Sequence, residues 1–173
     1  MNSDIQAPLP GVRVLVTGGT IDKVYHPTEG HLCFERTHVI QMLRQARVPL
    51  PDDCVQTILL KDSLDIVDAD REAIAAACRA SPESRLLITH GTDTMVRTGQ
   101  HLAHHVHGRT IVLTGAMVPF SVSHSDALFN FGFAMAAVQL LPAGVHVAMN
   151  GKVLPWERVR KNRAAGWFES TGP

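Results

Sequence analysis

The chain has 173 residues, of which 45% are hydrophobic, and its 16 Lys and Arg residues balance 16 Asp and Glu residues. This size and composition are ordinary for one globular domain, so we expect a single domain over residues 1–173. A net charge of zero provides no overall field to hold nucleic acid or an anionic membrane, which argues against both as partners.

Targeting signals and cysteine usage indicate the compartment. Residues 1–10 lack the basic start and apolar core of a secretory signal, and no apolar run is long enough to span a bilayer. The three cysteines, Cys33, Cys54 and Cys78, are an odd number without Cys-x-x-Cys spacing. This pattern argues against a disulfide framework or a zinc site. We expect a cytoplasmic protein whose cysteines are small, partly buried apolar side chains.

Strands and helices are expected to alternate along the chain. The first apolar run, Val12–Val16, predicts a buried strand, and the Gly- and Pro-punctuated stretch Asp22–Leu32 predicts a loop. Apolar spacing and capping residues predict helices over Thr37–Arg47, Asp68–Ala80, Thr94–His107 and Ser125–Leu141. Later strands are expected over Val55–Leu60, Leu86–Thr89, Thr110–Leu113, Val145–Met149 and Lys152–Leu154.

Turn and cap residues refine this pattern. Asn150-Gly151 favours a two-residue type I′ hairpin, which makes the last two strands antiparallel. Ser123, Ser125 and Asp126 are candidate caps of the last helix. The alternation predicts an α/β fold, a single three-layer domain with a mostly parallel, mixed central sheet flanked by helices.

Three strands are followed by short loops rich in threonine and glycine. Ligands of open α/β sheets bind beyond the carboxyl ends of parallel strands, so these loops predict one composite pocket. Its candidate reactive groups are Thr20 and Thr92, and a threonine hydroxyl needs a neighbour that takes its proton or polarises it. Such residues after a strand are also ordinary turn and cap residues, which leaves a purely structural role open. The loops are Thr17-Gly18-Gly19-Thr20, Thr89-His90-Gly91-Thr92 and Thr114-Gly115-Ala116.

Other polar residues are expected near the same edge of the sheet. Tyr25 lies in the loop after Thr20, and Asp93 follows Thr92 directly. The segment Asp62-Ser63-Leu64-Asp65 follows the second strand and adds a hydroxyl and two carboxylates. Together these residues provide candidates for proton transfer and for binding a small polar molecule.

These motifs resemble the amino-terminal domain of the bacterial L-asparaginases. Thr17-Gly18-Gly19-Thr20-Ile21 resembles the first signature of that family, and Thr89-His90-Gly91-Thr92-Asp93-Thr94-Met95 matches the second residue for residue. Val159-Arg160-Lys161 falls where the family has its catalytic lysine. Further matches in the same order are Gly115-Ala116-Met117-x-Pro119 and Asp126-x-x-x-Asn130.

The resemblance implies hydrolysis of L-asparagine to L-aspartate and ammonia through a threonine acyl-enzyme, with weaker activity on glutamine. It implies that Thr20 is the first nucleophile, assisted by Tyr25, and that Thr92, Asp93 and Lys161 form a second catalytic group. Because a free lysine is protonated at neutral pH, we expect a charged Lys161 that orients Asp93 and polarises Thr92. No cofactor or metal is implied. The implied substrate-binding residues are Gly19, Asp62, Ser63, Gly91, Thr92, Asp93 and Ala116.

The chain also departs from that family. Most members are about twice as long, and their carboxy-terminal domain lends an acidic residue to a neighbouring active site. We expect this chain to be similar to the short single-domain asparaginases and to bind substrate weakly. Leu64 stands where many relatives have a polar residue, so asparagine is expected to be preferred over glutamine.

Alternatives come from other function classes. A non-catalytic amino-acid-binding homologue would keep the pocket but lack a reactive hydroxyl or the lysine, and none is missing. A nucleotide-binding module is disfavoured because the chain lacks G-x-G-x-x-G and G-K-[ST]. We expect no metal at the histidine cluster, since no Cys or carboxylate close in sequence completes a ligand set. Its members are His101, His104, His105 and His107.

Two further expectations concern packing. His90 is expected to pack behind the pocket. The helix over Ser125–Leu141 has apolar residues on several sides, including Phe129, Phe131 and Phe133. A helix apolar around so much of its circumference is often buried against a partner, so we expect a homo-oligomer, a dimer or a tetramer, as in the relatives.

Overall fold

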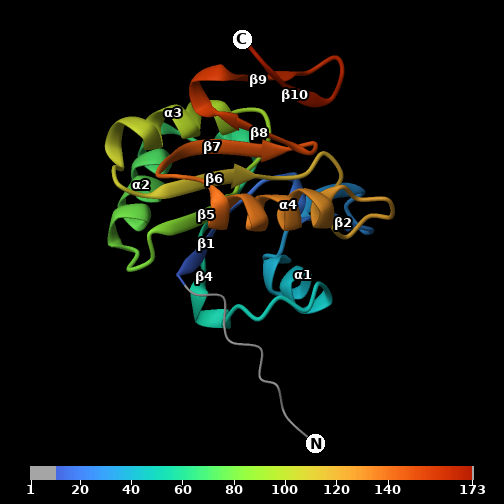
Figure 1. Ribbon diagram of the computed structural model, residues 1–173. Helices are drawn as coiled ribbons and strands as arrows, with labels where there is room; N and C mark the ends of the chain where they lie inside the picture. The colour runs from blue at the N-terminus through green and yellow to red at the C-terminus, as the bar shows by residue number, and fades with distance from the viewer. Residues whose placement is uncertain (1–10, 173) are drawn as a thin grey trace, which may run out of the picture.

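The computed structural model describes residues 11–172, and a six-stranded sheet lies at its centre (Figure 1). The strand order is β4-β1-β5-β6-β7-β8. All neighbours pair in parallel except β7 and β8, which are antiparallel, so the predicted mostly parallel, mixed sheet is confirmed. The expectation for residues 1–10 lies outside the described residues, and the single domain over 1–173 stays a prediction. The strands are β1 Val12–Gly18, β4 Val55–Lys61, β5 Arg85–Thr89, β6 Thr110–Thr114, β7 Gly144–Met149 and β8 Lys152–Pro155.

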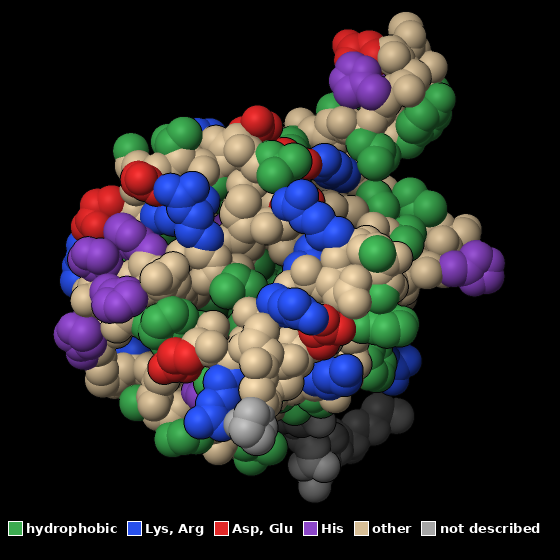
Figure 2. Space-filling view, turned by 90° about the horizontal axis from the view of Figure 1, so that it is seen from above, with side chains coloured by type: hydrophobic (Ala, Val, Ile, Leu, Met, Phe, Trp, Pro, Cys, Tyr) green, Lys and Arg blue, Asp and Glu red, His purple; other side chains and the backbone are tan. Residues whose placement is uncertain are grey.

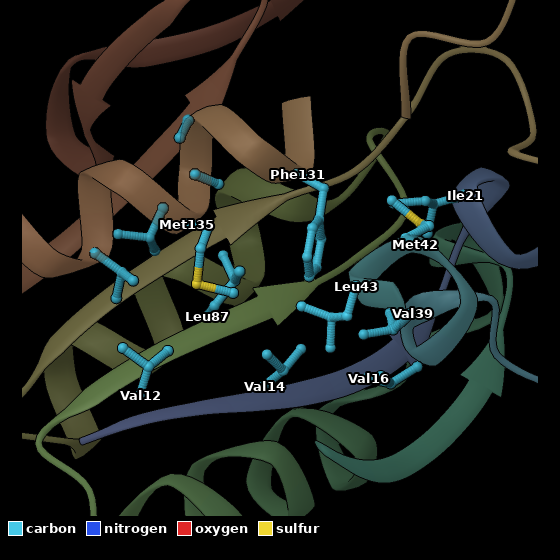
Figure 3. Close-up of a cluster of buried hydrophobic side chains, with 14 of the residues drawn as sticks. Val12, Val14, Val16, Ile21, Val39, Met42, Leu43, Leu87, Phe131 and Met135 are labelled. Carbon is cyan, nitrogen blue, oxygen red and sulfur yellow. The ribbon is translucent and has the colours of Figure 1, made fainter. Parts of the chain in front are cut away.

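Helices cover both faces of the sheet and make it a three-layer structure (Figure 1). On one face α1 (Val39–Gln45) and α4 (Ala127–Leu140) pack on the strands, and Figure 3 shows side chains of both helices in this cluster. On the other face α2 (Asp68–Ala80) and α3 (Met95–His105) bury a second cluster. Adjacent residues of a strand point to opposite faces, which explains why apolar runs rather than alternating patterns mark these strands.

The loop predicted over Asp22–Leu32 is wrong. After a short 3-10 turn at Thr20–Asp22, strand β2 (Lys23–His26) pairs with the antiparallel strand β3 (His31–Phe34). The Gly and Pro residues in this stretch mark only the turn between the strands. Gly30 there has φ 69° and donates its N–H to the carbonyl of His26 at 2.8 Å. The turn residues therefore predict a loop where the chain forms a whole hairpin.

A second hairpin near the end of the described chain was not predicted. Strand β9 (Val159–Asn162) pairs antiparallel with β10 (Trp167–Ser170), and the two strands form a separate two-stranded sheet. Phe168 of β10 is fully buried in the second core cluster. The remaining short 3-10 turns are at Asp52–Cys54, Ser63–Asp65 and Trp156–Arg158.

Local signals fixed several boundaries well. Helix α2 has the predicted bounds, and the Asn150-Gly151 turn has left-handed φ values of 54° and 72°, as a type I′ hairpin requires. Helix α1 begins at Val39 rather than Thr37, and it ends at Gln45, before the predicted Arg47, because Arg47 adopts φ 54°, which no helix continues. All three cysteines are free, with Cys78 buried and the other two half-buried. No helix between residues 11 and 172 has the length and apolar character needed to cross a membrane.

The strand order predicts a binding crevice beside β1. From β1 the chain moves to β4 on one side and then returns to β5 on the other side of β1. In open α/β sheets ligands bind at such a reversal, outside the carboxyl ends of the strands. The loops at this position follow Gly18 and Thr89, and they are the loops that carry Thr20 and Thr92.

Candidate active site

Three loops at this edge of the sheet meet through glycine residues. A Cβ at Gly19 would lie 2.3 Å from the backbone nitrogen of Gly91, and a Cβ at Gly91 would lie 2.6 Å from the Cβ of Ser63. Only glycine permits such approaches. The loops after β1, β4 and β5 are therefore in direct contact, and Thr20 and Thr92 each lie one residue from the contact between Gly19 and Gly91.

Lys161 brings the second threonine and its neighbouring carboxylate together. Its Nζ lies 2.7 Å from Thr92 Oγ1 and 3.0 Å from Asp93 Oδ1. The Lys161 side chain is 13% exposed, and Thr92 is buried. Arg163 Nε also lies 3.3 Å from Asp93 Oδ1, so two cations face one carboxylate oxygen. The predicted group of Thr92, Asp93 and Lys161 is thus assembled, although Lys161 comes from the unpredicted strand β9.

Ser63 is fixed against the loop that carries Thr92. Its Oγ accepts the N–H of Asp93 at 3.2 Å, and its carbonyl accepts the hydroxyl of Thr94 at 2.6 Å. Ser63 is almost fully buried. Because its Oγ acts as acceptor in the first bond, its hydroxyl hydrogen is available to an incoming group.

Asp62 is held by a lysine that sequence reasoning missed. Lys23 Nζ of β2 lies 2.5 Å from Asp62 Oδ2, and Asp62 Oδ1 accepts the N–H of Leu64 at 3.1 Å. Burial raises the pKa of Asp62, but the hydrogen bonds from Lys23 and Leu64 outweigh it and hold this pKa below its usual value. No motif or spacing signals a contact between residues 39 positions apart.

Thr20 and Tyr25 are less closely associated than the second group. Thr20 is half-buried and directly follows Gly19, whose φ of 82° turns the chain out of β1. Tyr25 lies on β2 with 59% of its surface exposed. Across residues 11–172 no hydrogen bond joins Tyr25 to Thr20. Ala116, the remaining predicted site residue, is buried just beyond β6.

Asp126 has a different role from the predicted helix cap. Ser125 Oγ accepts the N–H of Ala127 at 3.0 Å, whereas the Asp126 carboxylate turns back to the loop after β6. It accepts the N–H groups of Met117 at 3.0 Å and Val118 at 2.9 Å. Asp126 thus fixes the third loop of the predicted pocket.

Asp126→Asn should lower the free energy of unfolding by about 2 kcal/mol, because hydrogen bonds to a charged acceptor are lost. The new amide would also face Asn130 Nδ2, which now donates to Asp126 Oδ2 at 2.8 Å. Urea denaturation measures the change. The exposed Asp65→Asn variant is the control, and an equal change in both variants would contradict this role for Asp126.

Two titratable side chains are buried behind the two threonine loops. Asp22 is fully buried, and burial raises its pKa to about 6 although its Oδ1 accepts the N–H of His38 at 2.8 Å. His90 is also fully buried, and burial lowers its pKa to about 4. Its Nδ1 bonds the carbonyl of Gly91 at 2.7 Å, and its Nε2 bonds the hydroxyl of Thr98 at 2.8 Å. His90 therefore packs behind the loop that carries Thr92.

The contributions of Asp22 and His90 to folding stability should change in opposite directions as the pH changes. The pKa of Asp22 is higher in the folded state, so its contribution is complete below pH 3.8 and is lost as the pH rises to about 6. The pKa of His90 is lower in the folded state, so its contribution is complete above pH 6.5 and is lost as the pH falls to about 4. Each contribution amounts to about 3 kcal/mol when complete. Between pH 4 and 6 one contribution falls as the other rises, so their pH dependences largely cancel.

Asp22→Asn should remove the contribution of Asp22 to this pH dependence of stability. The free energy of unfolding of wild type minus that of the variant is expected to grow by about 2 kcal/mol as the pH falls from 6.5 to 4. Urea denaturation across this pH range measures the difference. Asp52→Asn is the control, because Asp52 forms an exposed ion pair with Arg44. A difference that does not change with pH would contradict the buried-acid account.

The histidine cluster lies away from these loops, along α3, and Figure 2 shows histidine side chains gathered on this side of the molecule. His101 Nε2 lies 3.4 Å from Glu72 Oε2 of α2, a carboxylate that the sequence analysis did not place nearby. His104 and His105 bond carbonyls of their own helix through Nδ1. Within the described part of the chain, no group of three or more His, Cys, Asp or Glu side chains could hold a metal ion.

Comparisons with known proteins identify the family of this chain. Residues 11–170 match the family model described as "Asparaginase, N-terminal". L-asparaginase 1 of Escherichia coli strain K12 is 28% identical over 173 residues, which cover 94% of this chain and 50% of that protein. The chain thus spans about half the length of the curated relatives it matches.

Solved structures of L-asparaginases are similar to this chain over about half of their own length. The thermostable L-asparaginase from Thermococcus kodakarensis has a TM-score of 0.79 at 28% identity, over 94% of this chain and 52% of that chain. The probable cytoplasmic L-asparaginase from Campylobacter jejuni has a TM-score of 0.75 at 28% identity, over 92% and 51%. Because the family model covers almost every described residue, this chain belongs to the asparaginase family and corresponds to its N-terminal domain.

Proposed function

We propose that this chain hydrolyses the side-chain amide of L-asparagine to L-aspartate and ammonia. The observation that carries this proposal is the contact of Lys161 Nζ with Thr92 Oγ1 and Asp93 Oδ1, at 2.7 and 3.0 Å. Amide hydrolysis needs a nucleophile, a proton carrier for the leaving nitrogen and donors for the oxyanion. The glycine contact between the loops after β1 and β5 supports a site that combines this group with Thr20.

In the first half of the reaction, Thr20 Oγ attacks the carbon of the carboxamide. The Thr20 proton passes with help from Tyr25 to the amide nitrogen, the tetrahedral intermediate collapses with cleavage of the C–N bond, and the nitrogen departs as ammonia. The product of this step is an aspartyl ester on Thr20. Backbone N–H groups of the glycine-containing loops are the candidate oxyanion donors.

In the second half, water attacks the ester carbon, the bond to Thr20 Oγ breaks, one proton of the water returns to Thr20 Oγ, and L-aspartate is released. Thr92, polarised by the Lys161 ammonium and kept close to Asp93, assists proton transfer in this group. Neither half requires a cofactor or a metal ion, since every proton and electron pair moves between substrate, water and the side chains named.

Substrate recognition follows from charge and hydrogen bonding. The Asp93 carboxylate attracts the α-ammonium group, and the Ser63 hydroxyl donates to the α-carboxylate. Asp62 orients the turn that carries Ser63. The loops of Gly19, Gly91 and Ala116 enclose the carboxamide with backbone groups. Leu64 is 65% exposed and its side chain has no hydrogen-bonding group, which supports a preference for asparagine over glutamine.

The quaternary structure and compartment are also proposals. We propose a homo-oligomer because Leu140 of α4 is 84% exposed, and Phe129 of α4 is 62% exposed and stacks on Phe133. Three free cysteines support the cytoplasm. Light scattering of the purified chain measures the oligomeric state, and a monomer at working concentration would contradict the first proposal.

Ammonia release by the purified chain tests the proposed activity. We expect turnover of L-asparagine, slower turnover of L-glutamine and a Michaelis constant above the low micromolar range. Calorimetric binding of L-asparagine without ammonia release would contradict the proposal and would favour a non-catalytic amino-acid-binding homologue. Equal efficiency with both amides would contradict only the preference.

A further inference from the structure

The hairpin that carries Lys161 is separate from the main sheet. Within residues 11–172, strands β9 and β10 pair only with each other, and a two-stranded hairpin is marginally stable alone. Phe168 of β10 pairs directly with Lys161 of β9. Contacts that fix Phe168 therefore also fix the backbone of Lys161.

A side chain of the main sheet bonds this hairpin. Asn150, in the turn between β7 and β8, accepts the N–H of Phe168 on its Oδ1 at 3.1 Å. The backbone N–H of Asn150 donates to Asn130 Oδ1, also at 3.1 Å. Asn130 is almost fully buried in α4. The turn is thus held on one side by α4 and holds the β9–β10 hairpin on the other.

Asn130 extends this connection to the third loop of the site. Its Nδ2 donates to the carbonyl of Gly115 at 3.2 Å and to Asp126 Oδ2 at 2.8 Å. Asp126 in turn holds the N–H groups of Met117 and Val118. One chain of hydrogen bonds therefore runs from the loop after β6, through two asparagines, to the strand opposite Lys161.

We propose that Asn150 is a positioning residue for Lys161, an inference that rests on the proposed function. Packing of the Phe168 ring is not directional. The hydrogen bond from the Phe168 N–H to Asn150 Oδ1 is directional, so it fixes the position of β10 relative to the turn between β7 and β8. This bond holds the Lys161 ammonium over Thr92 and Asp93. A displacement of about 1 Å at a reacting group can cost on the order of 100-fold in rate, which is why a single hydrogen bond matters here.

The test compares three variants of the purified full chain. Asn150→Gly removes the carboxamide but keeps a residue that favours the left-handed φ of 54° at this turn. Asn150→Asp keeps an acceptor oxygen at the same place and also tolerates this φ. Arg47→Gly is the control, because it places glycine at another left-handed position, φ 54°, away from the site.

We expect Asn150→Gly to lower kcat for L-asparagine by about 10- to 100-fold, with KM changed by less than about 3-fold. Asn150→Asp should keep most of the wild-type kcat, and Arg47→Gly all of it. Amide hydrogen exchange should show lost protection of the Phe168 N–H only in Asn150→Gly. In a Lys161→Met background, Asn150→Gly should slow the reaction no further, because both changes act through the same group.

Other results would overturn the positioning role. These are a wild-type kcat in Asn150→Gly, an equal loss in Asn150→Asp, or a full additional loss in the Lys161→Met background. Wild-type protein that releases no ammonia would contradict the proposed function itself. Since the wild-type rate and the ratio of variant to wild type are separate measurements, the two failures are distinguishable.

Discussion

Lys161→Met should lower kcat for ammonia release from L-asparagine by about three orders of magnitude. General acid–base groups contribute about 10²- to 10⁴-fold, and this substitution removes the only ammonium group within 3.0 Å of Thr92 and Asp93 in the described part of the chain. A steady-state ammonia assay measures the loss. Lys152→Met, an exposed change on β8, is the matched control and should keep the wild-type rate.

Lys161→Arg separates two accounts of this lysine. If the side chain acts as a cation that orients Asp93 and polarises Thr92, arginine retains most of the activity and the pH–rate profile keeps its shape. If it acts as a neutral base, arginine abolishes activity while the protein remains folded, because a guanidinium does not deprotonate in proteins. Arg163 already places one guanidinium 3.3 Å from Asp93 Oδ1, which supports the first account.

Gly19→Ala should lower the free energy of unfolding by about 2–6 kcal/mol. About 1–3 kcal/mol comes from placing a Cβ at φ 82° and ψ −178°, a region that essentially only glycine populates, and overpacking costs about 1–3 kcal/mol more. The new Cβ would lie 2.3 Å from the backbone nitrogen of Gly91, so the backbone itself has to shift. Catalysis should fall as well, because Thr20 and Thr92 follow these two glycines.

Gly30→Ala is the matched control for this prediction. Gly30 also has a left-handed φ, 69°, but apart from its own atoms and those of its two chain neighbours, no heavy atom of residues 11–172 lies within 4 Å of the position its Cβ would take. Only the conformational cost of about 1–2 kcal/mol is therefore expected. Urea denaturation of both variants separates the two contributions. An equal loss in Gly19→Ala and Gly30→Ala would contradict the close contact between the loops.

The main features of the fold were predictable because they depend on local signals. The Ala-rich composition of α2, its early acids and its late Arg79 gave the correct helix, and Asn150-Gly151 gave the correct turn. The β2–β3 hairpin was missed because Gly30 and its neighbours were assigned to a loop. The β9–β10 hairpin was missed because it is short and only Phe168 anchors it as a fully buried residue.

The site was predictable where motifs and the resemblance named residues, and unpredictable where distant pairs meet. Thr92, Asp93 and Lys161 form the predicted group. The contact of Lys23 with Asp62, the second cation at Asp93 and the bond from Phe168 to Asn150 have no sequence signal. Such pairs depend on how the hairpins fold back over the loops, and neither spacing nor composition reports that geometry.

The central claim is that Thr20 and Thr92 act on the same carboxamide, and the rates of ammonia release by Thr20→Ala, Thr92→Val and the double variant test it most directly. We expect each single change to lower kcat by about 10³-fold or more, and the double variant to be little slower than either, as for residues that act as one unit. A wild-type rate in either single variant, or losses that multiply in the double variant, would contradict the account.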